Sequence, residues 1–168
     1  MEIQKVESPR AAERTAALAR EIWTEHYEPI IGRDQAAYMV DTFQSADAIL
    51  SGIAKQGYEY YLAQEDGVPA GYLAIRPEPE EHALFLSKIY VKKEFRRRGL
   101  ARRFLTLAQR RARETGCTLL WLTVNRNNEG SIAAYRRMGF SVACTMVTDI
   151  GNGYVMDDYK MTRPVSDA

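Results

Sequence analysis

The sequence predicts an α/β protein whose mixed, mostly antiparallel sheet carries helices on both faces. Short apolar runs bounded by turn residues recur along the chain, as is typical of strands. Longer segments with apolar residues at helical spacing separate these runs. The length of 168 residues suits one domain with a buried core, so we expect a single domain over residues 1–168.

The first third of the chain is predicted to form one strand and three helices. Residues 2–6 alternate between polar and apolar side chains, which indicates a short strand. Ser8 as N-cap and Pro9 at the first helical position predict a helix that continues to residue 27. Two shorter helices are expected over residues 32–45 and 46–56, the second closed by a glycine.

Three strands are expected in the middle of the chain. Residues 58–64 and 70–75 flank an Asp66-Gly67 pair, which is typical of a hairpin turn. Residues 76–82, with the sequence RPEPEEH, are expected to form an acidic loop. The third strand follows it over residues 82–91.

A long helix over residues 99–116 is the clearest helical prediction. Its apolar side chains form one stripe, and Gly116 supplies the C-terminal stop; the stripe consists of Leu100, Phe104, Leu107 and Ala108. Residues 118–124 form a continuous apolar run, which predicts a strand buried on both faces.

The C-terminal part is predicted to add one short helix and a hairpin. The helix spans residues 128–139 and ends at a glycine. The hairpin strands cover residues 140–149 and 154–161, with IGNG between them.

Composition and charge exclude several classes of protein. The net charge of +1 argues against a general binder of nucleic acid or of anionic membranes. The N-terminus carries charges without an apolar run, and the longest apolar run is too short to span a bilayer. Cys117 and Cys144 lie in apolar contexts without CxxC spacing, so we expect buried thiols and no metal site. These features predict a cytoplasmic protein.

One segment concentrates positive charge around a glycine. Residues 92–103 hold seven cations and one acid, although the whole chain is nearly neutral. The segment joins a predicted strand to the long helix, where free backbone N–H groups and the helix dipole favour an anion. Gly99 leaves the main chain accessible, and the arginines can donate charge-assisted hydrogen bonds to phosphate. The pattern predicts a pyrophosphate site, and it matches neither the P-loop nor the GxGxxG motif.

The sequence RRRGLA resembles the R/Q-x-x-G-x-G/A signature of the GCN5-related N-acetyltransferase (GNAT) superfamily, with Arg96, Gly99 and Ala101 at the signature positions. A second segment, NEGSIAAYRRMGF, resembles the family's Asn-x6-Tyr-x3-Gly-Phe pattern at Asn128, Tyr135, Gly139 and Phe140. The resemblance implies the GNAT fold, in which two central strands splay apart. In this sequence the two strands would be residues 86–91 and 118–124. It also implies acetyl-CoA as donor and a primary amine as acceptor.

The resemblance further implies a role for each matched residue. Main-chain groups of the strand would pair with the pantetheine arm, and one N–H group would polarise the acetyl carbonyl; the strand residues are Ile89, Tyr90 and Val91. The pyrophosphate would be held by Arg96, Arg97, Arg98, Gly99, Leu100, Ala101 and Arg102. Asn128 would bond the polar arm of the cofactor. Tyr135 would act as general acid toward the leaving thiolate.

The residues leave the general base and the acceptor open. The candidates for the base are Glu25, His26, Glu78, Glu80, Glu81, Asp149, Asp157 and Asp158. Three further segments, IWTEHYEPIIG, DTFQS and VTDIGNGYVMDDY, look like the PaiA type of bacterial acetyltransferase, which acts on polyamines. The family resemblance leaves four classes of acceptor open: polyamines, amino acids, aminoglycosides, and protein N-termini or lysines. The acidic sequences EPEE and MDDY favour a polycation such as spermidine or spermine. Relatives of this kind are often homodimers.

Three other interpretations of the cationic segment compete with the enzyme. A solvated basic helix start does not explain the small residues at positions 99 and 101. A nucleic-acid-binding module would need a larger basic surface with base-reading side chains. A non-catalytic CoA-binding sensor would keep the binding residues and show no turnover.

Overall fold

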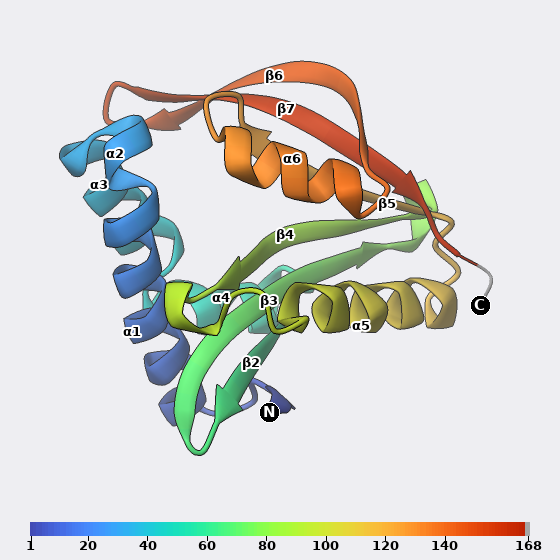
Figure 1. Ribbon diagram of the computed structural model, residues 1–168, viewed down its shortest axis with the longest axis horizontal. Coiled ribbons are helices and arrows are strands. Elements are labelled where there is room, and N and C mark those ends of the chain that lie inside the picture. The colour runs from blue at the N-terminus through green and yellow to red at the C-terminus, as the bar shows by residue number, and fades with distance from the viewer. Residues whose placement is uncertain (167–168) are drawn as a thin grey trace. The chain divides into compact units, whose positions relative to one another are not determined.

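The computed structural model describes residues 1–166, and their contacts group the chain into two compact units (Figure 1). Unit 1 consists of residues 1–76 and 88–105, and unit 2 consists of residues 77–87 together with the chain from residue 106 onward. The strand β4 (Ala83–Val91) and the helix α5 (Leu100–Glu114) each contribute residues to both units. The single domain over residues 1–168 stays a prediction.

Unit 1 combines a sheet with a group of helices. Its remaining elements are β1 (Glu2–Lys5), α1 (Pro9–His26), α2 (Glu28–Ile31), α3 (Arg33–Phe43), α4 (Ala46–Lys55), β2 (Glu59–Glu65), β3 (Val68–Glu78) as far as residue 76, and the 3-10 turn η2 (Lys93–Phe95). The strand order is β1-β2-β3-β4, and β2 pairs antiparallel with both β1 and β3. Helix α1 contacts α2, α3 and α4, which lie beside it in Figure 1.

The N-terminal helices form for the expected reasons. The Ser8 hydroxyl accepts a hydrogen bond from the Ala11 N–H at 3.1 Å, and Pro9 is the first residue of α1. The apolar face of α1 is fully buried at Leu18, Ile22 and Trp23. The four-residue helix α2 was not predicted, because it is too short to give a periodic pattern.

Unit 2 contains the C-terminal strands. Its remaining elements are the 3-10 turn η1 (Pro79–Glu81), β5 (Leu119–Asn125), α6 (Glu129–Arg137), β6 (Ser141–Gly151) and β7 (Tyr154–Pro164). The strand order is β4-β5-β7-β6; β4 and β5 are parallel, and β7 pairs antiparallel with β5 and β6. The β4–β5 register runs from Ala83 opposite Leu119 to Phe85 opposite Trp121, so Ile89–Val91 lie beyond it.

Two predictions about secondary structure are wrong in part. Residues 76–82 are not a simple loop, because β3 continues to Glu78 and a 3-10 turn follows. The Trp121 indole N–H donates to the Glu78 carboxylate at 2.8 Å, which fixes the end of β3 within unit 2. Strand β5 is not buried on both faces, since fully buried and half-buried residues alternate along it. On the less buried face, the Trp121 ring stacks on Phe85 at 4.1 Å.

The two cysteines differ in exposure, which corrects the prediction that both are buried. Cys117 is buried, and its thiol donates to the Ala83 carbonyl at 3.2 Å. Cys144 is exposed because it lies on β6, the last strand in the order of unit 2.

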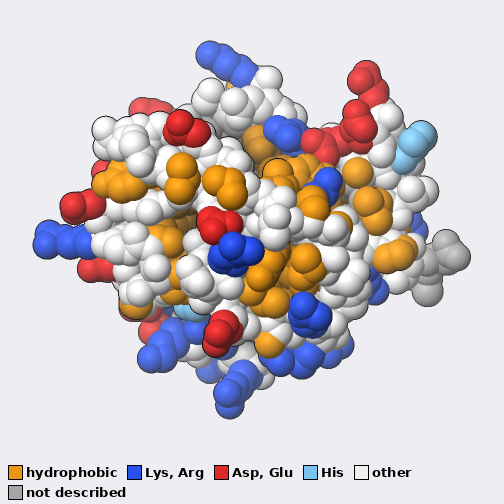
Figure 2. Space-filling view, turned by 90° about the horizontal axis from the view of Figure 1, so that it is seen from above, with side chains coloured by type: hydrophobic (Ala, Val, Ile, Leu, Met, Phe, Trp, Pro, Cys, Tyr) orange, Lys and Arg blue, Asp and Glu red, His pale blue; other side chains and the backbone are white. Residues whose placement is uncertain are grey.

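The surface carries charges of both signs. Figure 2 shows lysine, arginine and acidic side chains interspersed with apolar ones on the face that it draws. Across residues 1–166, no helix combines the length and apolarity needed to cross a membrane. The described residues also contain no cluster of three or more His, Cys, Asp or Glu side chains suited to a metal ion.

Candidate functional site

The C-terminal end of β4 is fixed by an aromatic cluster in unit 1. The Tyr90 ring makes edge contacts with Tyr72 at 5.3 Å, Tyr27 at 5.7 Å and Trp23 at 5.8 Å. Trp23 and Tyr27 stack on each other at 4.2 Å. The buried Tyr72 hydroxyl donates to the Gln44 side-chain oxygen. These contacts hold the main chain of Ile89, Tyr90 and Val91, the residues expected to pair with pantetheine.

A glycine on β3 allows β4 to lie close to it. A Cβ atom built on Gly71 would lie 2.6 Å from the Tyr90 carbonyl oxygen and 3.0 Å from Leu100 Cδ2. The Lys92 N–H donates to the Ala70 carbonyl at 2.8 Å, which continues the contact between the two segments. Gly71 therefore sets the position of the strand end that leads into the cationic segment.

The start of α5 has the backbone features of an anion site. The Arg103 N–H donates to the Gly99 carbonyl at 3.1 Å, so the preceding amides lie in the first turn, where helical partners are lacking. Gly99 has a φ of 80° and Arg97 a φ of 63°, both in the left-handed region. A Cβ atom on Gly99 would meet no heavy atom within 4 Å, so the space beside this main chain is open.

The cations around Gly99 have different partners. Arg98 forms an ion pair with Glu65 at 2.7 Å, and its guanidinium lies over the Phe95 ring. Arg96 Nε donates to the Val91 carbonyl at 3.2 Å, which ties the loop to the end of β4. Leu100 is 2% exposed and anchors the helix start in the core, whereas Arg97 and Arg102 are exposed. All of the predicted pyrophosphate residues thus lie in one loop and helix start of unit 1.

The other two predicted site residues belong to unit 2. Asn128 is 2% exposed, and its side-chain oxygen accepts from the Ser131 N–H at 3.3 Å, which makes it the N-cap of α6. Tyr135 is half-buried on α6, with its ring 6.0 Å from that of Phe140 in an edge geometry. Helix α6 therefore presents Tyr135 from a capped and well-defined position.

The carboxyl groups considered as general base differ in their environments. Glu78 accepts from Trp121, Asp149 accepts from the Gly151 N–H, and Asp157 forms an ion pair with Arg126 at 3.3 Å. Asp158 is 4% exposed, and burial, with a smaller effect of Asp157, raises its pKa to about 6. Within residues 1–166, one of its oxygens lacks a hydrogen-bond partner. The raised pKa makes the Asp158 carboxylate a stronger base than an ordinary aspartate.

Two residues with a bearing on the site were not singled out from the sequence. Gly71 interrupts the strand run AGYLAI, and an isolated glycine in a strand often marks a close backbone approach. Lys88 is the one charged residue in the strand sequence ALFLSKIYV. A lone charge inside an apolar run was the signal that could have identified it.

Comparison with known proteins identifies the family. Residues 16–140 match the model of the acetyltransferase (GNAT) family. The chain is 27% identical over 131 residues to an N-acetyltransferase of the pepI 3′ region of Lactobacillus delbrueckii subsp. lactis, covering 74% of this chain and 76% of that protein. It is 38% identical over 76 residues to streptothricin acetyltransferase of Streptomyces lavendulae, covering 45% of this chain and 40% of that protein.

A solved structure has the same fold along almost the whole chain. PaiA N-acetyltransferase from Thermoplasma acidophilum, in complex with coenzyme A, superposes with a TM-score of 0.78 at 19% identity. The match covers 98% of this chain and 99% of that one. The mixed α/β fold expected from the sequence is confirmed.

The fold and the family match define an acyl-transfer enzyme. The chain belongs to the GNAT family, and it is an N-acetyltransferase that uses acetyl-CoA.

Proposed function

We propose that this enzyme transfers the acetyl group of acetyl-CoA to a primary amine, with the start of α5 as the binding site for the cofactor's pyrophosphate. The observation that carries the proposal is the open main chain at Gly99, where a side-chain atom would meet nothing within 4 Å. Exposed arginines flank this space, and the first turn of α5 supplies amides. These residues fit a diphosphate in charge and in access.

The end of β4 supplies main-chain groups in this proposal. Ile89, Tyr90 and Val91 would pair with the pantetheine arm as a neighbouring strand does. The cofactor brings an activated acetyl thioester, and an N–H group of this strand would stabilise negative charge on the acetyl oxygen. The aromatic cluster around Tyr90 supports the role, because a fixed donor loses little energy in reorientation.

Tyr135 is assigned the transfer of a proton to the leaving thiolate, and Asn128 a hydrogen bond to the cofactor's polar arm. A thiol has a pKa of about 8.5 and tyrosine one of about 10, so the transfer is slightly uphill and helps when it accompanies cleavage of the C–S bond. The family motif and the fixed position of α6 support both assignments.

Two observations bear on the polyamine acceptor suggested by the sequence. Glu80 and Glu81 are exposed on the η1 turn, so they are available to a cationic ligand. The PaiA structure shares the fold. Spermidine and spermine therefore belong in the first panel of acceptors.

The experiment that tests the proposal follows free thiol released from acetyl-CoA in the presence of a panel of primary amines. Amine-dependent release supports the enzyme, whereas binding of acetyl-CoA without release would indicate a sensor. A matched titration with DNA addresses the third alternative. Affinity for DNA that falls steeply with salt, without affinity for acetyl-CoA, would indicate a nucleic-acid-binding module.

Replacement of Gly99 by valine is expected to raise the KM for acetyl-CoA about tenfold or more, because the new side chain fills the open space and strains a left-handed residue. Gly67→Val is the control for strain. Gly67 has a φ of 78° with nothing within 4 Å, but it lies in the turn between β2 and β3. Both variants should lose stability, and only Gly99→Val should lose affinity for the cofactor. An unchanged KM for acetyl-CoA in Gly99→Val would show that the pyrophosphate does not bind at the start of α5.

Replacement of Tyr135 by phenylalanine is expected to lower kcat by about ten- to a hundredfold and to change the KM for acetyl-CoA little, because a general acid acts in the transition state. Steady-state kinetics with a fixed amine measures both constants. Full kcat in the phenylalanine variant would show that another group protonates the thiolate.

A further inference from the structure

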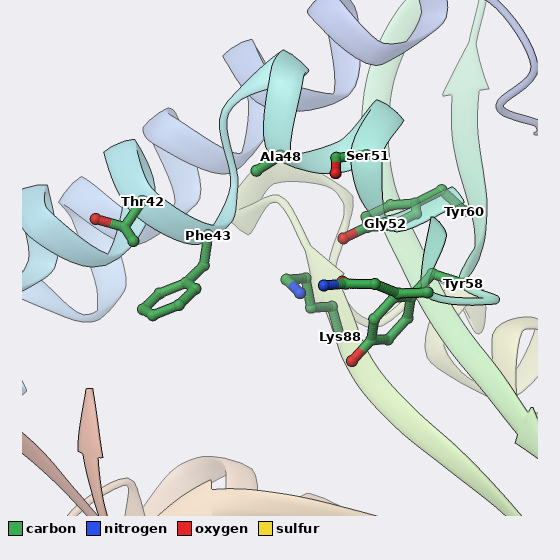
Figure 3. A pocket seen from close by; sticks show the side chains of 9 residues that line it. Thr42, Phe43, Ala48, Ser51, Gly52, Tyr58, Tyr60 and Lys88 are labelled. Atoms are coloured by element: carbon green, nitrogen blue, oxygen red, sulfur yellow. The ribbon is translucent and has the colours of Figure 1, made fainter. Parts of the chain in front are cut away.

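A pocket in unit 1 has no role in the reaction as described so far. Its volume is about 280 Å³, and α3, α4, β2 and β4 line it (Figure 3). The lining residues are Thr42, Phe43, Ala48, Ser51, Gly52, Gln56, Tyr58, Tyr60 and Lys88. Gly52 allows Tyr58 to pack close to α4, since a Cβ atom there would lie 3.3 Å from Tyr58 Cδ2.

Lys88 is the charged residue among those that line the pocket. In Figure 3, Phe43 lies on one side of the Lys88 side chain, and Tyr58 and Tyr60 lie on the other. Its ammonium nitrogen is 5.8 Å from the ring centre of Tyr58 and 5.7 Å from that of Tyr60. Burial lowers the pKa of Lys88 to about 8, so the group is still mainly protonated at pH 7.

The remaining polar groups of the pocket can donate hydrogen bonds. Hydroxyl or amide groups are present on Thr42, Ser51, Gln56, Tyr58 and Tyr60. Arg76 donates to the Tyr58 oxygen at 3.2 Å, which leaves the proton of that phenol to donate elsewhere. Burial raises the pKa of Tyr60, so its phenol stays protonated.

These groups favour an anionic ligand over a cationic one. No Asp or Glu is among the described residues that line the pocket. Arg76 lies 4.9 Å from the ring centre of Tyr58, and Lys88 also faces this ring. An alkylammonium group in the pocket would meet the like charge of Lys88, and the Tyr58 ring already has two cations over it. A monoanion such as a carboxylate would be matched by the single charge of Lys88.

The pocket is also close to the strand assigned to the acetyl group. Lys88 directly precedes Ile89 on β4, and a strand advances about 3.3 Å per residue. A small molecule held at Lys88 can therefore reach the main chain of Ile89–Val91 with a chain of a few bonds. This adjacency along β4 is the reason to consider the pocket as a binding site for the acceptor.

We propose that the Lys88 pocket binds the carboxylate of the acceptor, so that the enzyme acetylates the amino group of a small amino acid in preference to a polyamine. The assignment rests on the proposed function, and it names the substrate class of the same site. Lys88 acts as the counter-ion of the carboxylate, with hydroxyl groups of the pocket as further donors.

The test compares ω-amino acids with α,ω-diamines of the same length, from two to six carbons, in the thiol-release assay. In each pair, a terminal carboxylate takes the place of the second aminomethyl group. At the best length, kcat/KM for the amino acid is expected to exceed that for the diamine by about tenfold or more, the typical effect of one buried charge pair. Equal values, or a preference for the diamines, spermidine or spermine, would overturn the proposal.

Lys88→Met separates this effect from folding. Methionine has a similar length and removes the charge of a half-buried side chain, so the variant should fold at least as stably. We expect it to lose the preference for amino acids over diamines, whereas Lys88→Arg should retain part of the preference. Lys55→Met, which removes an exposed cation at the end of α4, is the matched control and should leave the preference unchanged. An unchanged preference in Lys88→Met would overturn the proposal.

Calorimetric titration with 4-aminobutanoate in the absence of acetyl-CoA distinguishes the two possible failures. In one outcome, the parent binds 4-aminobutanoate, Lys88→Met does not, and no amine causes thiol release. This result would support the carboxylate pocket and contradict the proposed transfer reaction. In the other outcome, diamines and amino acids cause equal thiol release, and 4-aminobutanoate binds the parent and Lys88→Met equally or not at all. This result would support the transfer reaction and contradict the carboxylate pocket.

Discussion

Gly71→Ala is expected to lower the free energy of unfolding by about 2–3 kcal/mol, the upper part of the range for over-packed cores. The added methyl group would lie 2.6 Å from the Tyr90 carbonyl oxygen, which belongs to the main chain and cannot rotate away. Either β3 or the end of β4 must shift, and the shift would also disturb the strand assigned to pantetheine. Denaturant unfolding monitored by circular dichroism measures the change in stability.

Gly130→Ala is the control for this prediction. Gly130 lies in α6, and a Cβ atom there would meet no heavy atom within 4 Å. Alanine favours a helix by about 1 kcal/mol over glycine, so this variant should be as stable as the parent or more stable. Equal stability of Gly71→Ala and the parent would show that β3 and β4 can separate without loss.

Asp158→Asn is expected to stabilise the protein by about 2–3 kcal/mol at pH 7. The pKa of Asp158 rises from 3.8 to about 6 on folding, mainly because burial disfavours the charged form, and one pKa unit is worth about 1.4 kcal/mol. The folded state therefore binds the proton more tightly than the unfolded state. The contribution of this group is most favourable below pH 4 and is lost as the pH rises through 6.

The measurement is the difference in unfolding free energy between Asp158→Asn and the parent from pH 3 to pH 8. The difference should be small at the acid end and should grow between pH 4 and pH 6, which separates it from the other carboxyl groups. Asp157→Asn is a second variant for comparison: its exposed ion pair with Arg126 is worth about 1 kcal/mol or less, and loss of its charge should lower the pKa of Asp158 only slightly. A constant difference over the whole range would show that Asp158 titrates normally.

The sequence predicted the helices and strands where a local signal is strong. Ser8 and Pro9 marked the start of α1, and the stripe of apolar residues marked α5. The four residues of α2 gave no such signal, because one turn of helix is shorter than the period that a pattern requires. The end of β3 was also missed, since the Trp121 contact that fixes Glu78 comes from a residue 43 positions away.

The candidate site was predicted where a motif occupies consecutive residues. The loop from Arg96 to Arg102 has the open glycine that the motif requires, and this could be expected from the sequence. The environments of Lys88 and Asp158 could not be predicted from the sequence. The burial of a single charged side chain depends on elements that are far apart in the chain. Lys88 lies over the rings of Tyr58, just before β2, and Tyr60, within β2, and it lines a pocket together with residues of α3 and α4. Asp158 is opposite Met146 on β6 and Asn125 on β5.

The aromatic cluster around Tyr90 also gives the protein an internal optical label. Trp23 is one of two tryptophans in the chain, and it stacks on Tyr27 and contacts the Tyr90 ring. Indole emission responds to the dipoles and rings around it, so a small rearrangement of the main chain at Tyr90 changes the fluorescence of Trp23. With Trp121 replaced by phenylalanine, Trp23 is the remaining indole, and its emission reports on the cluster around Tyr90 without any added dye.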